Sequence, residues 1–245
     1  MEPKLQLNKD EKGTAVNSTK YRRLIGSLRY LTHTRPDLAY SVRIVSRYME
    51  NPKESHLQAV KQILRYVKGT IQFGLIYLKG GEGELIGYSD SNLAGDLDDR
   101  KSTSGMMFYY SGKPVTWCSQ KQRIVALSSC EAEFMAATAA AYQAIWPRSL
   151  LSEATGEEPR PVLLRVDNKS TIALMKNPVF HERSKHIDTR FHFILGCIEK
   201  GLISVEHVSS EEQCADILTK ALPRVKFREM RELIGVKDLN LFSQD

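Results

Sequence analysis

Cysteine is scarce in this sequence, and its spacing does not suggest a metal site or a disulfide framework. The chain has 4 cysteines, Cys118, Cys130, Cys197 and Cys214, and no two of them form a CxxC pair. No apolar run approaches the roughly 18 residues that a membrane helix requires. The first residues, MEPKLQLNKDEKG, lack the apolar core of a secretory signal. We therefore expect an intracellular protein with reduced thiols and no membrane segment, in the cytoplasm or the nucleus.

Positive charge is unevenly distributed along the chain. Residues 1–80 contain 15 Lys and Arg against 6 Asp and Glu, and residues 81–245 contain 20 against 23, for a net charge of +6. A basic front suits an anionic polymer such as nucleic acid. A solvated helical surface would show the same composition, so charge alone favours neither interpretation.

The 245 residues suffice for one large domain or for a domain with an appendage. Residues 1–20 are polar and predict a flexible lead-in. Apolar residues at helical spacing then predict three helices with basic outer faces, over Tyr21–Leu31, Arg35–Met49 and His56–Thr70. We expect these helices to form a small unit within residues 21–72.

The pattern changes to extended segments near Gln72. GLIYLKGGEGELIGYSD predicts two extended runs about a glycine-rich turn. Further strands are predicted over Thr103–Gly112, Pro114–Lys121, Pro161–Asp167 and Ile203–Val208, and helices over Ser128–Ile145, Asn168–Asn177, Phe180–Gly201 and Glu211–Leu222. This order predicts an α/β fold, a mixed five-stranded sheet flanked by helices. Pro147 predicts a break or kink in the long helix near Ile145.

Four acidic residues stand where the predicted elements would bring them together. Asp90 ends the first strand of the sheet, Asp167 ends the fourth, Glu133 lies near the start of the helix between them, and Asp216 lies in the last helix. Ligand sites in open sheets form at the carboxyl ends of central strands. Adjacent carboxylates need a counter-charge, which Mg²⁺ or Mn²⁺ supplies. We predict a site for two such ions, the usual arrangement for attack of water on a phosphodiester.

Simpler interpretations exist for each of these residues. Asp90 could form a turn, and Asp167 with Asn168 could cap the next helix. Three histidines, His181, His186 and His192, raise zinc as an alternative, but no cysteine or regular ligand spacing accompanies them. Three further aspartates in GDLDDRKS, Asp96, Asp98 and Asp99, lack the aromatic lead-in of a polymerase hairpin and indicate a loop.

Several strings resemble a known family. SDSNLAGD, CEAEFMAA, LLRVDNKSTI and VEHVSSEEQCADILTKAL are similar to the four acidic motifs of ribonuclease H, in the form found in Pol polyproteins of copia-type long-terminal-repeat retrotransposons. DRKSTSGMMFYYSGKPVTWCSQKQ, SKHIDTRFHFI and YRRLIGSLRYLTHTRPDLAYSV add to the resemblance. It implies a reverse-transcriptase thumb-like remnant over residues 21–72, a ribonuclease H domain over 73–235 and a tail over 236–245. The chain would then be a fragment or a truncated copy.

The resemblance also implies roles for individual residues. Asp90, Glu133, Asp167 and Asp216 match the metal-binding carboxylates, and Glu133 fits the pattern better than its neighbour Glu131. His207 matches a histidine that assists proton transfer or product release. Three residues are implied to contact nucleic acid, namely Ser128, Asn168 and Lys185.

The implied activity is metal-dependent hydrolysis of the RNA strand of an RNA–DNA hybrid. The implied partners are that hybrid and the rest of a reverse transcriptase polyprotein. One alternative is a catalytically inactive nucleic-acid-binding remnant, which would need no metal. Another is a different nuclease on the same fold, such as an integrase or a resolvase, which would act on duplex DNA.

Overall fold

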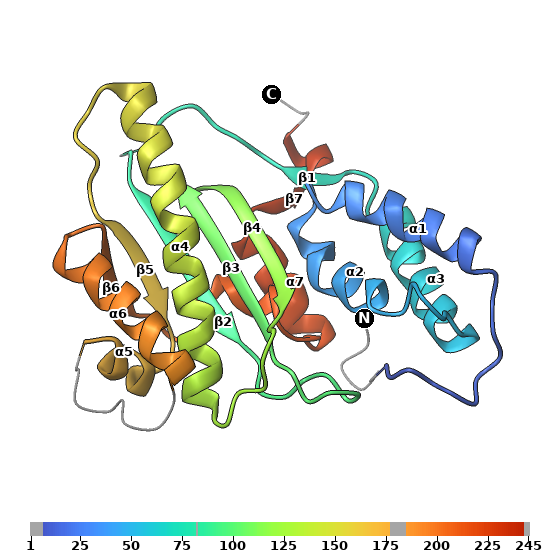
Figure 1. The fold of residues 1–245 in the computed structure, drawn as a ribbon. Helices are drawn as coiled ribbons and strands as arrows, with labels where there is room; N and C mark the ends of the chain where they lie inside the picture. The colour runs from blue at the N-terminus through green and yellow to red at the C-terminus, as the bar shows by residue number, and fades with distance from the viewer. Residues whose placement is uncertain (1–6, 82, 177–184, 243–245) are drawn as a thin grey trace.

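The computed structural model of the chain describes residues 7–81, 83–176 and 185–242, with only the backbone described for residues 185–188 and 242. A central sheet is covered by helices on both faces, and a bundle of helices from the N-terminal part of the chain packs beside it (Figure 1). Within the described residues, no helix is both long and apolar enough to cross a membrane.

The N-terminal helices form a unit with its own core. They are α1 (Ser18–Leu31), the 3₁₀ turn η1 (Pro36–Leu38), α2 (Ala39–Ser46) and α3 (Glu54–Lys68). Tyr21, Ile25, Val45 and Val60 are buried together between the helices, because these apolar residues recur at helical spacing. All three predicted helices are present, and the second begins as a 3₁₀ turn at Pro36, where the proline ring presets φ for the first turn.

The lead-in contacts this helical unit from Leu7 onward. The carbonyl of Leu7 accepts a hydrogen bond from the Tyr48 hydroxyl at 2.9 Å, and the carbonyl of Asn8 lies 2.7 Å from Nε2 of His56. The backbone N–H of Val16 donates to the carbonyl of Pro52 at 3.2 Å. These bonds fix the path of the extended segment before α1.

The predicted mixed five-stranded sheet is confirmed. Its strands are β2 (Leu85–Ser91), β3 (Thr103–Tyr110), β4 (Lys113–Lys121), β5 (Val162–Val166) and β6 (Ile203–His207), in the order β4-β3-β2-β5-β6. The first three strands are antiparallel, whereas β5 and β6 run parallel to β2. The turn between β3 and β4 contains Ser111 and Gly112, both with positive φ, which suits a tight hairpin.

Three helices cover one face of this sheet. They are α4 (Ser129–Thr155), α5 (Lys169–Lys176) and α6 (Lys185–Glu199). Phe108 of β3, Phe134 of α4 and Leu164 of β5 are fully buried between the layers. Gly87 is required beneath them, because a Cβ at this position would lie 2.6 Å from the ring of Phe108.

The other face is covered by the C-terminal segments and by α2. These segments are η3 (Cys214–Leu218), α7 (Arg224–Leu233), β7 (Val236–Asp238) and η4 (Leu239–Phe242), and β7 pairs with β1 (Phe73–Leu75) in a small separate sheet. Met107, Leu218 and Met230 are buried together in this second core. The two extended runs predicted about the glycine-rich turn are therefore not neighbours, since β1 pairs with β7 and β2 with β3 and β5.

Two helix predictions are wrong. The helix predicted over Glu211–Leu222 is the short turn η3, capped by the Gln213 side chain, and the following α-helix α7 begins only after Pro223. Proline disfavours helical backbone in the residue before it, so the two segments cannot join. The break predicted at Pro147 is also absent, because α4 continues through it to Thr155. Pro147 is buried, and packing along α4 offsets the roughly 3 kcal/mol that a mid-helix proline costs.

Candidate active site

Three of the predicted carboxylates meet at one end of the sheet. Asp90 lies near the carboxyl end of β2, and Asp167 directly follows β5. These strands are parallel neighbours with Ser89 opposite Val166, so the two aspartates emerge side by side. Glu133 comes from the start of α4, and single ligand atoms of the three residues lie within 4.8 Å of one another. We call this group the carboxylate cluster.

Glu133 is held in place by the end of β2. The backbone N–H of Ser91 donates to one carboxylate oxygen of Glu133 at 3.0 Å. The other oxygen, Oε2, is buried and has no hydrogen-bond partner among the described residues. A buried carboxylate oxygen without a partner is costly in a protein interior. This oxygen therefore fits a bound cation.

Asp216 lies beside the carboxylate cluster, and the ammonium group of Lys220 contacts both. Nζ of Lys220 lies 2.8 Å from Oδ1 of Asp216 and 3.7 Å from Oδ2 of Asp90. The hydroxyl of Thr219 donates a hydrogen bond to Asp90 Oδ2. Asp216 in η3 thus supplies one further carboxylate, and Lys220 just after η3 supplies one positive charge.

Hydrogen bonds to β2 and its following loop position η3 over the sheet. The side-chain amide of Gln213 donates to the carbonyl of Ser89 at 3.0 Å, and that of Asn92 donates to the carbonyl of Thr219 at 2.8 Å. Gly105 of β3 allows the close approach, because a Cβ there would lie 2.8 Å from Cβ of Leu218. These hydrogen bonds place Asp216 next to the carboxylate cluster.

The carboxylates resist ionisation together. Burial, reinforced by the neighbouring Asp90 and Asp167, raises the pKa of Glu133 to about 9. Burial and the charge of Asp90 raise the pKa of Asp216 to about 7, and the same two causes raise the pKa of Asp167. A divalent cation would stabilise the ionised forms of all these groups, because opposite charge favours the charged state.

The structure separates Glu133 from Glu131. Oε2 of Glu131 accepts a hydrogen bond from the backbone N–H of Leu127 at 2.8 Å, and the Glu131 N–H donates to Oγ of Ser128 at 3.1 Å. Both contacts cap the start of α4. Glu131 and Ser128 therefore have a structural role here, and contact of Ser128 with nucleic acid remains a prediction.

The other predicted site residues lie around the carboxylate cluster or outside the described side chains. His207 is exposed at the end of β6, opposite Val166 of β5. Ser210, three positions on, donates to Oδ2 of Asp167 at 3.3 Å, which brings this loop to the site. Asn168 accepts from the Thr171 N–H at 3.1 Å and caps α5. The side chain of Lys185 lies outside the described residues, so the roles of His207, Asn168 and Lys185 remain predictions.

The alternative sites can now be placed. Within the described part of the chain, the carboxylate cluster is the one group of three or more potential metal ligands, while His181 and the side chain of His186 lie outside that part. Asp96 is instead an ion-pair centre, 2.8 Å from Arg47 Nη1 and 2.7 Å from Lys121 Nζ. Its pairing is consistent with the predicted loop.

Sequence reasoning missed Lys220, Thr219 and Ser210. All three lie in the string that carries Asp216, and their hydroxyl or ammonium groups reach the acidic residues. The only sequence signal was the spacing of Lys220 four residues after Asp216, which a helical turn would place on one face.

Comparison with known proteins agrees with this arrangement. A retrovirus-related Pol polyprotein from the transposon RE1 of Arabidopsis thaliana is 43% identical over 234 residues, which is 96% of this chain. The chain belongs to the Pol polyprotein family of copia-type retrotransposons. It covers only 16% of the length of that relative. No family model matches the chain.

Solved structures show the fold of this family member. A foamy viral protease–reverse transcriptase in complex with double-stranded DNA matches 80% of this chain and 32% of its own length, with 12% identity and a TM-score of 0.50. LC11-RNase H1 in complex with an RNA/DNA hybrid matches 56% of this chain and 94% of its own, with 16% identity and a TM-score of 0.41. The predicted mixed five-stranded sheet flanked by helices is confirmed by the strand order, and the foamy viral structure shares the fold of this chain.

Proposed function

We propose that this Pol-family chain is a metal-dependent endonuclease that hydrolyses the RNA strand of an RNA–DNA hybrid. The observation that supports this function best is the carboxylate cluster itself, with its ligand atoms within 4.8 Å of one another. The unpartnered buried oxygen of Glu133 adds to it. Closely grouped carboxylate oxygens are the ligands that Mg²⁺ and Mn²⁺ prefer.

Asp90, Glu133, Asp167 and Asp216 would hold two such ions. Bound there, the metal would supply an activated water and stabilise the departing oxygen of the phosphodiester. The protein's own contribution is positioning, because the Ser91 N–H orients Glu133 and the Thr219 hydroxyl orients Asp90. His207, exposed at the end of β6, would assist proton transfer or product release.

The proposed substrate follows from charge and from the chemistry of RNA. The basic helices α1 to α3 would hold the anionic duplex, so affinity should fall steeply with salt. Contacts to the 2′-hydroxyl and to the shape of the hybrid would select the RNA strand without reading bases. In a full-length Pol polyprotein, the remaining reverse transcriptase would be the covalent partner.

The decisive experiment is cleavage of a labelled RNA–DNA hybrid with Mg²⁺ or Mn²⁺. We expect cutting of the RNA strand alone, and a loss of at least about 10³-fold in Asp90→Asn and in Asp167→Asn, because each removes a ligand charge whose metal stabilises the transition state by several kcal/mol. Glu131→Gln is the matched control, since its amide oxygen can still accept from Leu127, and it should keep its activity.

Metal binding is measured separately by thermal denaturation with and without Mn²⁺. A ligand at 100 times its Kd stabilises the folded state by about 2.7 kcal/mol, so Mn²⁺ should raise the Tm of the wild-type chain and of Glu131→Gln. Glu133→Gln should lose most of that shift. Well-folded protein that binds the hybrid but neither cuts it nor responds to metal would contradict the enzyme proposal and favour a binding remnant.

A further inference from the structure

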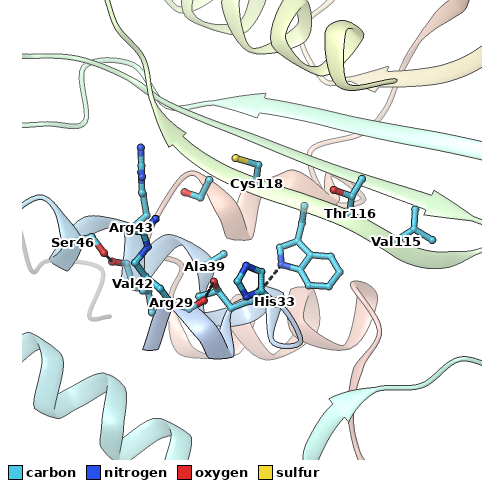
Figure 2. A pocket seen from close by; sticks show the side chains of 12 residues that line it. Arg29, His33, Ala39, Val42, Arg43, Ser46, Val115, Thr116 and Cys118 are labelled. Atoms are coloured by element: carbon cyan, nitrogen blue, oxygen red, sulfur yellow. Dashed lines mark hydrogen bonds between the residues drawn. The ribbon is translucent and has the colours of Figure 1, made fainter. Parts of the chain in front are cut away.

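A cleft separates β4 from the N-terminal helices, on the sheet face opposite α4. It has a volume of about 320 Å³ and is lined from below by Arg29, His33 and Arg43 and from above by Thr116 and Ser119. Figure 2 shows Arg43 extending from α2 toward the strand. Among the described residues, no Asp or Glu lines this cleft. We call it the Arg29–Arg43 cleft.

Arg43 differs from the other buried or half-buried arginines of the helical unit. Arg35 pairs with Asp37 at 2.8 Å, and Arg47 pairs with Asp96 at 2.8 Å. The half-buried guanidinium of Arg43 has no ion pair or hydrogen bond among the described residues. Burial, together with the nearby charges of Arg47 and Arg29, lowers the pKa of Arg43. The cleft therefore contains a positive charge that the protein does not neutralise.

A second polar group in the cleft is also unsatisfied. Oγ of Ser119 is buried and has no hydrogen-bond partner among the described residues. Buried hydroxyls normally have a partner, so its isolation beside an unpaired guanidinium indicates a ligand that accepts hydrogen bonds and carries negative charge. Arg29 and Arg43 lie in the last turns of α1 and α2, where the helix dipoles favour positive charge. The dipoles do not supply a hydrogen-bond partner for the Arg43 guanidinium or for the Ser119 hydroxyl.

The cleft lies in register with the carboxylate cluster. Asp90 of β2 is opposite Gly105 of β3, which is opposite Ser119 of β4. Residues directly opposite each other point to the same face of a sheet. Ser119 is thus two strand spacings from Asp90, about 10 Å. A nucleic acid lying over the carboxylate cluster could reach the cleft with a phosphate a few positions along its backbone.

We propose that the Arg29–Arg43 cleft binds a backbone phosphate of the nucleic acid. The guanidinium of Arg43 is suited to this ligand, since its planar donors match two phosphate oxygens, and Ser119 Oγ adds a third donor. The choice of a polymer over a free anion rests on the proposed function, in which a duplex lies along the end of the sheet near which Asp90 and Ser119 are in register. The cleft would set the path of that duplex across β4.

The test measures how hybrid binding depends on salt concentration. Binding is monitored by the fluorescence anisotropy of a labelled RNA–DNA hybrid in EDTA. Hydrolysis cannot occur there, so the result is independent of activity. Loss of one phosphate contact lowers the slope of log K against log salt by about 1. We expect that loss in Arg43→Gln and a loss of about 1 to 2 in Arg29→Gln/Arg43→Gln. Arg160→Gln is the matched control, an exposed arginine before β5 that lies outside both the cleft and the basic helices, and should leave the slope unchanged.

Further variants distinguish a binding defect from a folding defect. Arg43→Lys keeps the charge and should keep the slope while binding several-fold more weakly, and Ser119→Ala should weaken binding with the Tm unchanged. Equal slopes for Arg43→Gln, Arg160→Gln and wild type would overturn the proposal. So would stabilisation by inorganic phosphate that depends on Arg43 while hybrid binding does not, since the cleft would then be a site for a small anion. A slope loss in Arg43→Gln without any cleavage by the wild type would support the cleft and sink only the proposed function.

Discussion

Asp90 and Asp96 belong to the same stretch of chain and are almost equally buried, with exposed fractions of 1% and 3%, yet their surroundings are opposite. Asp96 lies between Arg47 and Lys121 and also accepts the backbone N–H of Asp98 at 3.0 Å. Asp90 faces Glu133 and Asp167, with Lys220 as the nearest cation at 3.7 Å. One buried aspartate is neutralised by the protein, and the other is surrounded by further negative charge.

This difference separates a structural site from a functional one. The ion pairs of Asp96 join α2 to β4 and so fasten the helical unit to the sheet. The carboxylate cluster gains nothing comparable, because its members repel one another and one oxygen of Glu133 has no hydrogen-bond partner in the described part of the chain. A fold accumulates uncompensated buried charge where a ligand supplies the compensation.

The largest effect on stability is expected at the neutralised site. Asp96→Ala leaves the charges of Arg47 and Lys121 without their carboxylate, and breaking a buried ion pair in this way costs about 3 to 5 kcal/mol. Urea denaturation in EDTA should show that the free energy of unfolding falls by about 3 kcal/mol. The folded fraction of Asp96→Ala should keep the metal-induced rise in Tm.

Lys61→Ala serves as the control for that measurement. Lys61 pairs with Glu54 at 3.4 Å on the surface, where their side chains are 46% and 45% exposed. Such pairs contribute less than about 1 kcal/mol. A loss in Asp96→Ala no greater than in Lys61→Ala would show that the pairing of Asp96 does not fasten the two parts together.

The two sites should respond to pH in opposite directions. The pKa of Glu133, raised from 4.5 to about 9, and that of Asp216, raised from 3.8 to about 7, make the metal-free folded state bind more protons than the unfolded state. Stability therefore falls as pH rises through this window. Burial alone would raise the pKa of Asp96, but hydrogen bonds from Lys121 and the Asp98 N–H lower it, so its contribution is lost as pH falls below about 4.

Urea denaturation in EDTA between pH 3 and pH 9 measures how the free energy of unfolding changes over both pH ranges. We expect the free energy of unfolding to fall by at least about 1 kcal/mol between pH 5 and pH 8.5. The fall should be smaller in Glu133→Gln, and adding Mg²⁺ should reverse it. A midpoint that rises steadily over this range and ignores Mg²⁺ would contradict the assignment of repulsion to the carboxylate cluster.

The smallest effect is expected from Lys220→Met. Its side chain is 42% exposed, so the ion pairs with Asp216 and Asp90 are screened and contribute no more than about 1 kcal/mol. The variant should unfold slightly earlier than wild type in EDTA, and Mn²⁺ should remove most of that difference by replacing the lost positive charge. A more stable variant in EDTA would mean that Lys220 does not offset the acidic residues.

Much of the fold was predictable from local patterns. Helical spacing in α1 to α3 and alternating apolar residues in β2 to β6 identify the elements, because each pattern reflects one buried face. The C-terminal segment was not predictable in this way. EEQCADILTKAL has helical composition, but Gln213 caps the start of the short turn η3, and Pro223 separates that turn from α7. The Gln213 side chain donates a hydrogen bond to the carbonyl of Ser89, and the Asn92 side chain donates one to the carbonyl of Thr219.

Local sequence patterns identify which acidic residues could form a site, since Asp90 and Asp167 lie at the ends of strands and Glu133 lies near the start of a helix. The distribution of charge around them depends on tertiary contacts. Lys220 meets Asp90, and Arg47 meets Asp96, across segments that are remote in the chain. The unpaired Arg43 of the Arg29–Arg43 cleft arises in the same way, from packing α2 against β4. Burial and pairing depend on these contacts, and no local pattern encodes them.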